Sequence, residues 1–512
     1  MSLEPVAARE LPALPEPALA RPTALFCNQF LLGPRCPDEL ADWPDLAVAG
    51  NFRLVAHPEL PVTRVVRGQR ALTLIGFMLD PDDPVADDRS ILARLLDDSD
   101  GVERIVQATA SLGGRWLLIA ESEQDAHLFT DALGLRQALY TQPDMTGELW
   151  VMSQAGLGAD LLGLRMDERA AGFLDSYVVR AQRPEYYWPG TTTPLAGVRR
   201  LLPNHVLDLR TGKAERYWPA APLPLFGMDS AVDRASLLMT GLLCAAATRF
   251  DLVLSVTAGI DSRVLLAAAR PIKDQVSYIT VRQAQMSDDN ADLQVPARLL
   301  HRLGLPHEIV RAPGSASARF SWAFKRNVFL AHDHYMPDAE ALMNRFGRRK
   351  AAATGSGAEV ARCASRQLLP LADRRGVTAR ELAWAEGMPH PYAEDAFREW
   401  LAGARDCTHV KLLDLFEWEQ GQGSWLAMTQ LEFDICWRDI VTPYNCRELL
   451  VTMLGVRQCH RRSPRYTLFT EIARRVWPEV LSESINPHKQ LGRVRALAHA
   501  LKYRLQTMVT SR

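Results

Sequence analysis

The residue pattern with the clearest chemical meaning lies in residues 251–270, where one apolar run enters a short turn that opens a second apolar run. The first run predicts a strand and the second a helix. The turn between them therefore leaves several backbone N–H groups unpaired at the positive end of the helix dipole, as a phosphate site requires. Asp261 stands where a Walker-type loop has its lysine, so a bridging metal ion must meet the phosphate charge. The turn predicts a site for Mg-pyrophosphate.

Residues 255–262, with the sequence SVTAGIDS, resemble the SGGxDS loop of the ATP pyrophosphatases, and the match through Arg263 is most similar to the asparagine synthetase family. The resemblance implies ATP and Mg2+ as cofactors, with Asp261 as a magnesium ligand. It implies that the nucleotide is held by Ser255, Thr257, Gly259, Asp261 and Ser262. Ala258 replaces the first Gly of the family loop, which a Cβ tolerates only if φ is negative or a neighbour has shifted. The alternative is an ordinary strand-to-helix turn.

A second segment supplies another acid. Residues 352–363, AATGSGAEVARC, are a small apolar run that enters a Gly-Ser-Gly turn and is followed by Glu359, a second oxygen donor for magnesium. The segment resembles the Gly-Glu-Gly-Ala-Asp-Glu motif of the family, which implies that Gly357 binds the nucleotide and that Glu359 replaces the metal-binding Asp. Ser356 stands where the motif has its first Glu, so aspartate is a doubtful substrate. The alternative is a Gly-rich helix start.

Strands and helices alternate after residue 229, which predicts a parallel α/β sheet that is covered on both faces. Ligands bind such sheets at the carboxyl ends of their strands. Thr280 and Val281 end the strand expected at 276–281, where backbone groups could hold an adenine, and the resemblance implies the same. The alternative is that Thr280 simply ends a strand.

Two more residues are candidates for catalysis. Lys489, in the sequence SINPHKQ, could supply a positive charge to a leaving pyrophosphate, and it resembles the late lysine of the family in role and order. Residues 425–450 resemble a helical segment of the family that ends in Glu-x-Arg-x-Pro-Phe. This places Asp439 where an acid could orient a substrate amine. A buried acid at a helix end is the alternative.

The N-terminal half also resembles the family, which usually begins with an Ntn-type glutaminase domain; the matching stretches are residues 114–140 and 187–218. The glutaminase reaction needs an N-terminal Cys whose free amine acts as the base. Position 2 is Ser, Cys27 is far along the chain, and the Asn-Gly-Glu segment that grips glutamine is replaced by LIGFMLDP. We therefore expect that no ammonia is made. A synthetase half joined to such a degenerate half is similar to β-lactam synthetases and lasso-peptide cyclases.

These observations predict four segments and an α/β fold class. We expect a disordered tail at 1–22, a layered α+β Ntn-like domain at 23–218, a Pro-rich linker at 219–228, and a parallel-sheet ATP-binding synthetase domain, of the adenine-nucleotide α-hydrolase type, at 229–512.

Composition narrows the classes of partner. The net charge of −1 favours neither nucleic acid nor membrane, the longest uncharged apolar stretch is too short to span a bilayer, and no leader is recognisable. The eight Cys lack any Cys-x-x-Cys pair, which indicates packed thiols. We expect a cytoplasmic enzyme whose partners are small-molecule or peptide carboxylic acids and amines, without nucleic acid or membrane.

The function expected is an AMP-forming amide ligase that acts through an acyl-adenylate and uses a substrate amine. The alternatives are an intramolecular cyclase of the β-lactam synthetase or lasso-peptide type, and a catalytically reduced nucleotide-binding or regulatory protein. A third alternative, adenylation of nucleic acid, is disfavoured by the neutral charge. The two substrates and the oligomeric state are left open.

Overall fold

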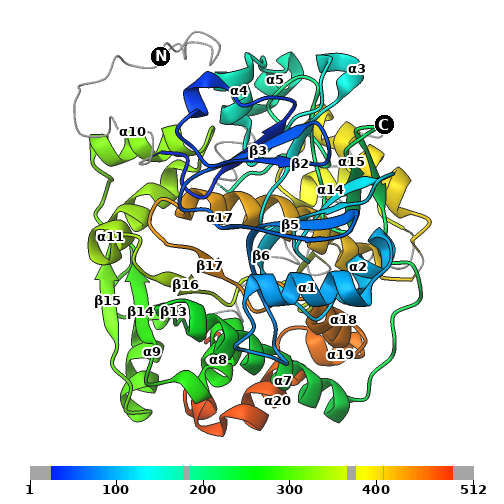
Figure 1. The fold of residues 1–512 in the computed structure, drawn as a ribbon. Coiled ribbons are helices and arrows are strands. Elements are labelled where there is room, and N and C mark those ends of the chain that lie inside the picture. The colour runs from blue at the N-terminus through cyan, green and yellow to red at the C-terminus, as the bar shows by residue number, and fades with distance from the viewer. Residues whose placement is uncertain (1–24, 177–184, 366–368, 370–375, 408, 488–512) are drawn as a thin grey trace, which may run out of the picture.

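The computed structural model describes residues 25–176, 185–365, 369, 376–407 and 409–487, and these form an α/β structure with antiparallel and parallel sheets (Figure 1). The expected tail at 1–22 and Lys489 lie outside the described residues. Two six-stranded antiparallel sheets, ordered β10-β8-β9-β1-β3-β2 and β12-β11-β7-β6-β5-β4, make up the N-terminal half. The strands of the first are β1 (Phe30–Gly33), β2 (Asp45–Val48), β3 (Phe52–Ala56), β8 (Leu139–Thr141), β9 (Val151–Met152) and β10 (Val198–Arg200). Those of the second are β4 (Val62–Arg67), β5 (Arg70–Leu79), β6 (Gly113–Glu121), β7 (Ala126–Thr130), β11 (His205–Asp208) and β12 (Lys213–Arg216).

The two antiparallel sheets pack face to face and are covered by helices on their outer sides. Leu32 of the first sheet and Ile75 of the second belong to one core between the sheets. α1 (Asp88–Asp98) and α2 (Val102–Ala108) cover the outer face of the second sheet, and α4 (Ala155–Leu162) packs on the first. The described part of this half also contains α3 (Pro143–Thr146) and α5 (Glu168–Asp175). The result is a helix–sheet–sheet–helix layering.

The C-terminal half is built on a five-stranded parallel sheet with the order β15-β14-β13-β16-β17. Its strands are β13 (Leu252–Ser255), β14 (Ser277–Arg282), β15 (Glu308–Arg311), β16 (Ala351–Ala353) and β17 (Ile440–Val441). From β13 the chain adds β14 and β15 on one side and then β16 and β17 on the other. The strand order therefore reverses between β13 and β16, and ligands of open α/β sheets bind outside the strand ends at such a switch point.

Helices cover both faces of the parallel sheet. Leu252 and Leu254 of β13 belong to a core with α7 (Met228–Arg249), α8 (Ile260–Ala268) and α20 (Thr467–Val476). Val253 belongs to a second core on the opposite face, with α10 (Ala318–Asn327), α11 (Met336–Phe346) and α17 (Ala427–Phe433). The other described α-helices are α9 (Ala291–Arg302), α14 (Ala379–Ala385), α15 (Pro391–Ala404), α16 (Leu412–Phe416), α18 (Arg447–Leu454) and α19 (Gln458–Arg461). A π-helical segment, η6 (Glu417–Leu426), follows α16. The short 3-10 helices are η3 (Asp38–Leu40), in the N-terminal half, and η4 (Arg270–Ile272), η5 (Asp333–Tyr335) and η7 (Pro478–Ser482).

The fold class expected from the sequence is confirmed by this topology: a layered antiparallel part is followed by a parallel sheet with helices on both faces. β13 is buried on both faces, which explains why its sequence is a continuous apolar run. Residues 217–227 connect β12 to α7 without regular structure. Phe226 in this connection packs against the core that contains α7, and its N–H donates to the Gly455 carbonyl at 3.1 Å.

α7 is the one helix among the described residues that is long and apolar enough, by length and composition, to cross a membrane. Its apolar window is 56% buried inside the structure. Leu238, Leu242 and Leu243 lie in the core that covers one face of the parallel sheet. The apolar character of α7 is therefore accounted for by its packing, because a helix that supports a central sheet needs a wide apolar surface.

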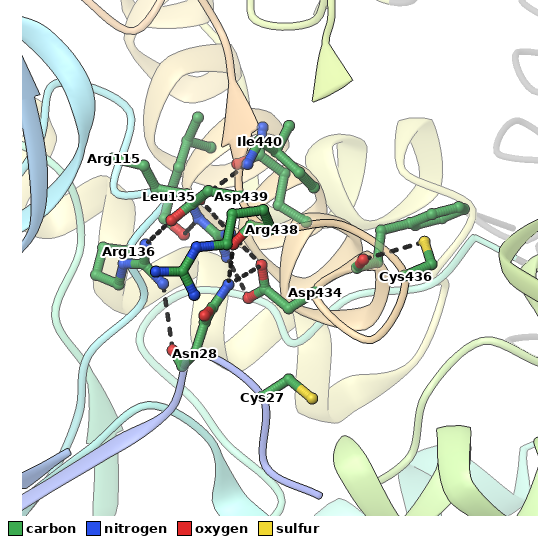
Figure 2. Close-up of polar contacts among 12 residues, drawn as sticks. Cys27, Asn28, Arg115, Leu135, Arg136, Asp434, Cys436, Arg438, Asp439 and Ile440 are labelled. Carbon is green, nitrogen blue, oxygen red and sulfur yellow. Dashed lines mark hydrogen bonds and ion pairs between the residues drawn. The ribbon is translucent and has the colours of Figure 1, made fainter. Parts of the chain in front are cut away.

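The two halves are joined by a buried group of ion pairs (Figure 2). Arg115 of β6 donates to Asp434 at 2.6 and 2.9 Å and to Asp439 at 3.3 Å, and Arg136 donates to Asp439 at 2.8 Å. Burial alone would lower the pKa of Arg115, but the charges of Asp434 and Asp439 raise it. Asn28, in the turn before β1, donates to Asp434 at 3.3 Å. Two cations from one half are thus neutralised by two anions from the other.

We expect Asp434→Ala to destabilise the folded chain by about 3–5 kcal/mol, because it leaves the buried guanidinium of Arg115 without its bidentate partner. The measurement is the urea midpoint followed by tryptophan fluorescence. Asp395→Ala is the matched control, because Asp395 pairs with Arg169 at an exposed position and its loss should leave the midpoint unchanged. Equal midpoints for Asp434→Ala and the wild type would contradict this role.

Candidate functional site

The turn between β13 and α8 has the strand–turn–helix geometry expected from the sequence. Gly259 is the N-cap of α8, with φ −71° and ψ 155°, and the first helical hydrogen bond runs from the Arg263 N–H to the Gly259 carbonyl at 3.3 Å. Residues 260–262 precede this bond and form the positive end of the helix dipole. Ala258 is absent from the residues with positive φ, so its Cβ is accommodated without strain. The departure from the SGGxDS pattern therefore leaves the turn geometry intact.

Side chains hold the turn closed from within. The Ser262 Oγ accepts from the Thr257 N–H at 3.2 Å, and the Thr257 Oγ1 accepts from the Gly259 N–H at 3.1 Å. The Ala258 N–H donates to the Asp292 carboxylate of α9 at 2.9 Å. Three amides of the turn therefore face oxygen acceptors, one of which is anionic. A phosphate oxygen bound at the Ala258 amide would take the place of this carboxylate.

The chain that leads to Lys489 is fastened to the same turn. Arg263, fully buried in α8, donates to the carbonyls of Val480 at 2.6 Å, Glu483 at 3.0 Å and Ser484 at 3.3 Å. The Asn486 N–H donates to the Ala258 carbonyl at 2.9 Å. Lys489 itself lies outside the described residues, so its contact with a leaving pyrophosphate stays a prediction. The described chain ends at Pro487, close to the turn.

The two acids expected to bind metal share one cation, the guanidinium of Arg362. Arg362 lies 2.9 Å from the Asp261 carboxylate and also donates to Glu359. Burial alone would lower the pKa of Arg362, but the charges of Glu359 and Asp261 raise it. Gly355 allows this approach, because a Cβ at this position would lie 2.9 Å from the backbone carbon of Asp261. The turns that follow β13 and β16 therefore converge at the switch point of the sheet.

The donor set at this point suits a hard cation in type, since carboxylates are the ligands that Mg2+ prefers. Asp261 and Glu359 are two such groups, and their present cation is Arg362. No cluster of three or more His, Cys, Asp or Glu side chains suited to a metal occurs in the described part of the chain. Phosphate oxygens and water would have to supply the other ligands, and the guanidinium would have to move.

Thr280, Val281 and Gly357, three further residues expected to bind the nucleotide, all make contacts within the protein. The Thr280 Oγ1 donates to the Val256 carbonyl at 2.7 Å and lies 2.9 Å from the His307 Nε2, so this side chain braces the end of β13. Val281 is partly buried and packs against the core on the α10 and α11 side. Gly357 has φ +89°, and its N–H donates to Glu359 at 3.1 Å. Whether these three residues touch a nucleotide stays a prediction.

Asp439 belongs to the ion pairs between the halves (Figure 2). It directly precedes β17, which pairs with β16 at the edge of the parallel sheet. The helical segment expected over residues 425–450 is therefore interrupted by this strand. One carboxylate oxygen accepts from the Ile440 N–H at 2.8 Å and from Arg115, and the other accepts from Arg136. At 3% exposure it is a structural acid in this arrangement. Its role toward a substrate amine stays a prediction.

Glu417 is an ionisable group that the sequence interpretation missed. It begins the π-helical segment η6, and its carboxyl group accepts from Ser365 at 2.5 Å and from Gln422 at 2.8 Å. Burial raises the pKa of Glu417 to about 7, and the charges of Glu386 and Glu359 act in the same direction. π-Helical turns occur often at functional sites. An acid with this pKa can give or take a proton near neutral pH.

A hollow of about 580 Å³ opens beside the turn, and its size is typical of small-molecule sites. Asp288 and Asp289 line it from the segment before α9, and Arg298 lines it from the second half of that helix. Ser484 and Pro487 line it from the segment that contacts the turn. The two carboxylates and the guanidinium in this lining favour a ligand that carries polar groups.

The solved structures that resemble this chain include three whose sequences are distant from it. No protein-family model matches the chain, and no curated protein matches it. Among solved structures, glutamine phosphoribosylpyrophosphate amidotransferase from B. subtilis, complexed with ADP and GMP, is 12% identical over 70% of this chain and 75% of that chain, with a TM-score of 0.24. A structure described as the allosteric regulatory enzyme of purine biosynthesis is 12% identical over 60% and 75%, with a TM-score of 0.24. Glutamine-dependent NAD+ synthetase from Acinetobacter baumannii, in complex with ADP, is 15% identical over 44% and 42%, with a TM-score of 0.16. Likenesses this distant leave the functional argument to the geometry of the site.

We expect Arg362→Gln to bind divalent cations more tightly than the wild type, on the order of tenfold, because it removes the cation that Asp261 and Glu359 now share. The measurement is a Mn2+ titration followed by electron paramagnetic resonance in the absence of nucleotide. Arg362→Lys keeps the charge and should stay near the wild type. An affinity that is unchanged or weaker in Arg362→Gln would show that the guanidinium does not compete with metal.

Glu417 should make the free energy of unfolding depend on pH. Its folded pKa of about 7 lies above the usual value of 4.5, so the folded chain holds this proton over a pH range where the unfolded chain has lost it. The contribution of Glu417 to stability therefore falls as pH rises from about 4.5 to about 7. We expect the stability of Glu417→Gln relative to the wild type to be greater at pH 8 than at pH 5, as measured by urea midpoints. A difference that is the same at both pH values would contradict the raised pKa.

Proposed function

We propose that this chain is an ATP-dependent ligase that joins a carboxylic acid to a substrate amine through an acyl-adenylate, with release of AMP and pyrophosphate. The observation that carries the proposal is the convergence of two turns at the switch point of the parallel sheet. Asp261 follows β13, Glu359 follows β16, and one cation joins them. A helix N-terminus at the carboxyl end of a strand can bind phosphate, and acids beside it can hold a cation that offsets the phosphate charge.

Each part of the site has a task in this reaction. The turn before α8 would bind the pyrophosphate part of ATP, with the Thr257 and Ser262 hydroxyls as adjustable partners. Magnesium, when bound, would neutralise phosphate charge. Asp261 and Glu359 would hold that cation, and Arg362, once released from them, would be a positive charge beside the phosphates. The reaction would then depend mainly on positioning and on stabilisation of the negative charge that develops on the leaving group.

The state of Cys27 supports a substrate amine over ammonia from glutamine. Cys27 precedes β1, and its nitrogen is a peptide amide that donates to the Asn327 Oδ1 at 2.9 Å. The side chain is 3% exposed, and burial raises the pKa of its thiol. A glutaminase nucleophile needs a reachable thiol and a free amine. Cys27 offers neither in this arrangement.

A second candidate function is a nucleotide-binding or regulatory protein with reduced catalysis. The observation in its favour is that Arg362 already satisfies both acids and that Asp292 already accepts from the Ala258 amide. A site locked in this way would bind a nucleotide without turning it over. The two candidates differ in one measurable property, which is the release of pyrophosphate.

We expect Asp261→Asn to abolish carboxylate-dependent ATP–pyrophosphate exchange while the urea midpoint stays near that of the wild type, because the change removes a charge at a partly exposed turn. Exchange would be measured with a library of small acids, and AMP release with acids and amines together. Asp274→Asn, an exposed acid of the same half, is the matched control. Full exchange in Asp261→Asn would refute the assigned role. Nucleotide binding by the wild type without exchange for any acid would favour the regulatory candidate.

A further inference from the structure

A small cavity of about 30 Å³ lies between the two halves, away from the turns that carry Asp261 and Glu359. Arg200 of β10 and Gln154, next to α4, line it from the N-terminal half. Phe329, Met428 and Leu431 line it from the C-terminal half. Side chains of both halves thus enclose the same space.

The polar groups that line this cavity include donors without acceptors. Arg200 is 3% exposed, and its Nε and Nη1 are buried and make no hydrogen bond in the described part of the chain. The Nε2 of Gln154 is also buried and makes no hydrogen bond in the described part of the chain. The orientation of this amide is fixed, because its Oε1 accepts from the Gly156 N–H at 2.7 Å and from the Phe329 N–H at 3.2 Å. Only the amide oxygen can accept these two hydrogen bonds, so the atom without an acceptor is the nitrogen of the NH2 group.

The described part of the chain also supplies no carboxylate to Arg200. Burial lowers the pKa of Arg200 to about 10, and the described side chains that act against this are Tyr187 and Tyr392, which are neutral at physiological pH. Two other buried arginines, Arg115 and Arg461, pair with the carboxylates of Asp434 and Asp414. Arg263, which is also buried, donates to three backbone carbonyls, whereas the Nε and Nη1 of Arg200 have no acceptor among the described residues. An arginine keeps its proton at physiological pH, and a buried charge needs a partner. The cavity beside Arg200 is therefore suited to a bound anion, which would supply both the acceptor and the counter-charge that the described residues do not.

We propose that this cavity is a binding site for one small monovalent anion, either chloride or the carboxylate of a one-carbon acid, held by Arg200 and Gln154. The volume of the cavity limits the kind of ligand, because one water molecule needs about 10–15 Å³ of such space. The cavity therefore admits an ion of one to three heavy atoms and excludes nucleotides and amino acids. Because both halves line the site, the anion stabilises their contact.

The test compares the thermal midpoint of the full chain in sodium chloride, sodium formate and sodium gluconate at one ionic strength, gluconate being too large for the cavity. We expect chloride or formate, at about a hundred times the dissociation constant, to raise the thermal midpoint by an amount that saturates on the order of a few degrees. Gluconate should not raise the midpoint. A rise with chloride alone identifies a halide site, and a rise with formate alone identifies a carboxylate site. Midpoints that are equal in all three salts would overturn the proposal and leave a cavity that holds water.

Three variants separate the site from general salt effects. Arg200→Met should lose the response, whereas Arg199→Met, the neighbour whose guanidinium pairs with Glu399 at the surface, should keep it. Gln154→Glu is nearly isosteric and supplies a built-in carboxylate, so it should fold, lose the response and resist heat in gluconate better than the wild type. Broadening of the 35Cl resonance by the wild type but not by Gln154→Glu reads out chloride binding directly. A response retained by Arg200→Met or Gln154→Glu would overturn the proposal.

Discussion

The constraint on which the rest of the structure depends is the neutralisation of arginine charges buried between the two halves. Arg115 and Arg136 reach from the N-terminal half to Asp434 and Asp439, all of them almost inaccessible to solvent. A shift of one half against the other that kept the boundary closed would leave these charges buried and unpaired, which is costly for each ion. The halves are therefore held in one relative position by charge as well as by apolar packing. Arg200, in the same boundary, has no carboxylate partner among the described residues, and its Nε and Nη1 have no hydrogen-bond acceptor there.

This constraint extends to the candidate site. Asp439 immediately precedes β17, and β17 pairs with β16, where Ala352 lies opposite Ile440. β16 runs into the turn with Gly355, Gly357 and Glu359. Leu133 of the N-terminal half also lies against Gly357, since a Cβ there would be 2.7 Å from its Cδ1. An N-terminal half without glutaminase chemistry thus still supports the geometry that places Glu359 near Asp261.

The sequence was sufficient for local features with a strong pattern. The apolar run of β13, the turn before α8 and the alternation of strands and helices follow from periodicity and turn chemistry. Arg362 could have been noticed as a cation three residues after Glu359, but its second partner, Asp261, is distant in sequence. Asp439 was misplaced on a helix, because a two-residue strand has almost no periodicity and its pairing is non-local. Nothing in the sequence marked Glu417 or Arg200, since burial and missing partners are properties of the folded chain alone.

Arg362 is where the structure and the proposed function must be reconciled. Its guanidinium lies between the carboxylates of Asp261 and Glu359 and offsets their mutual repulsion. Under the proposed function, the nucleotide arrives with its own cation and with additional negative charge. Asp261 and Glu359 would then bind the incoming cation, and the guanidinium of Arg362 would contact the phosphates. Each charge would thus have a partner both before and after the nucleotide binds. An arginine suits this exchange better than a lysine, because its planar fork can contact two oxygen groups at once. The same residue can therefore hold the resting site together and take part in its occupied state.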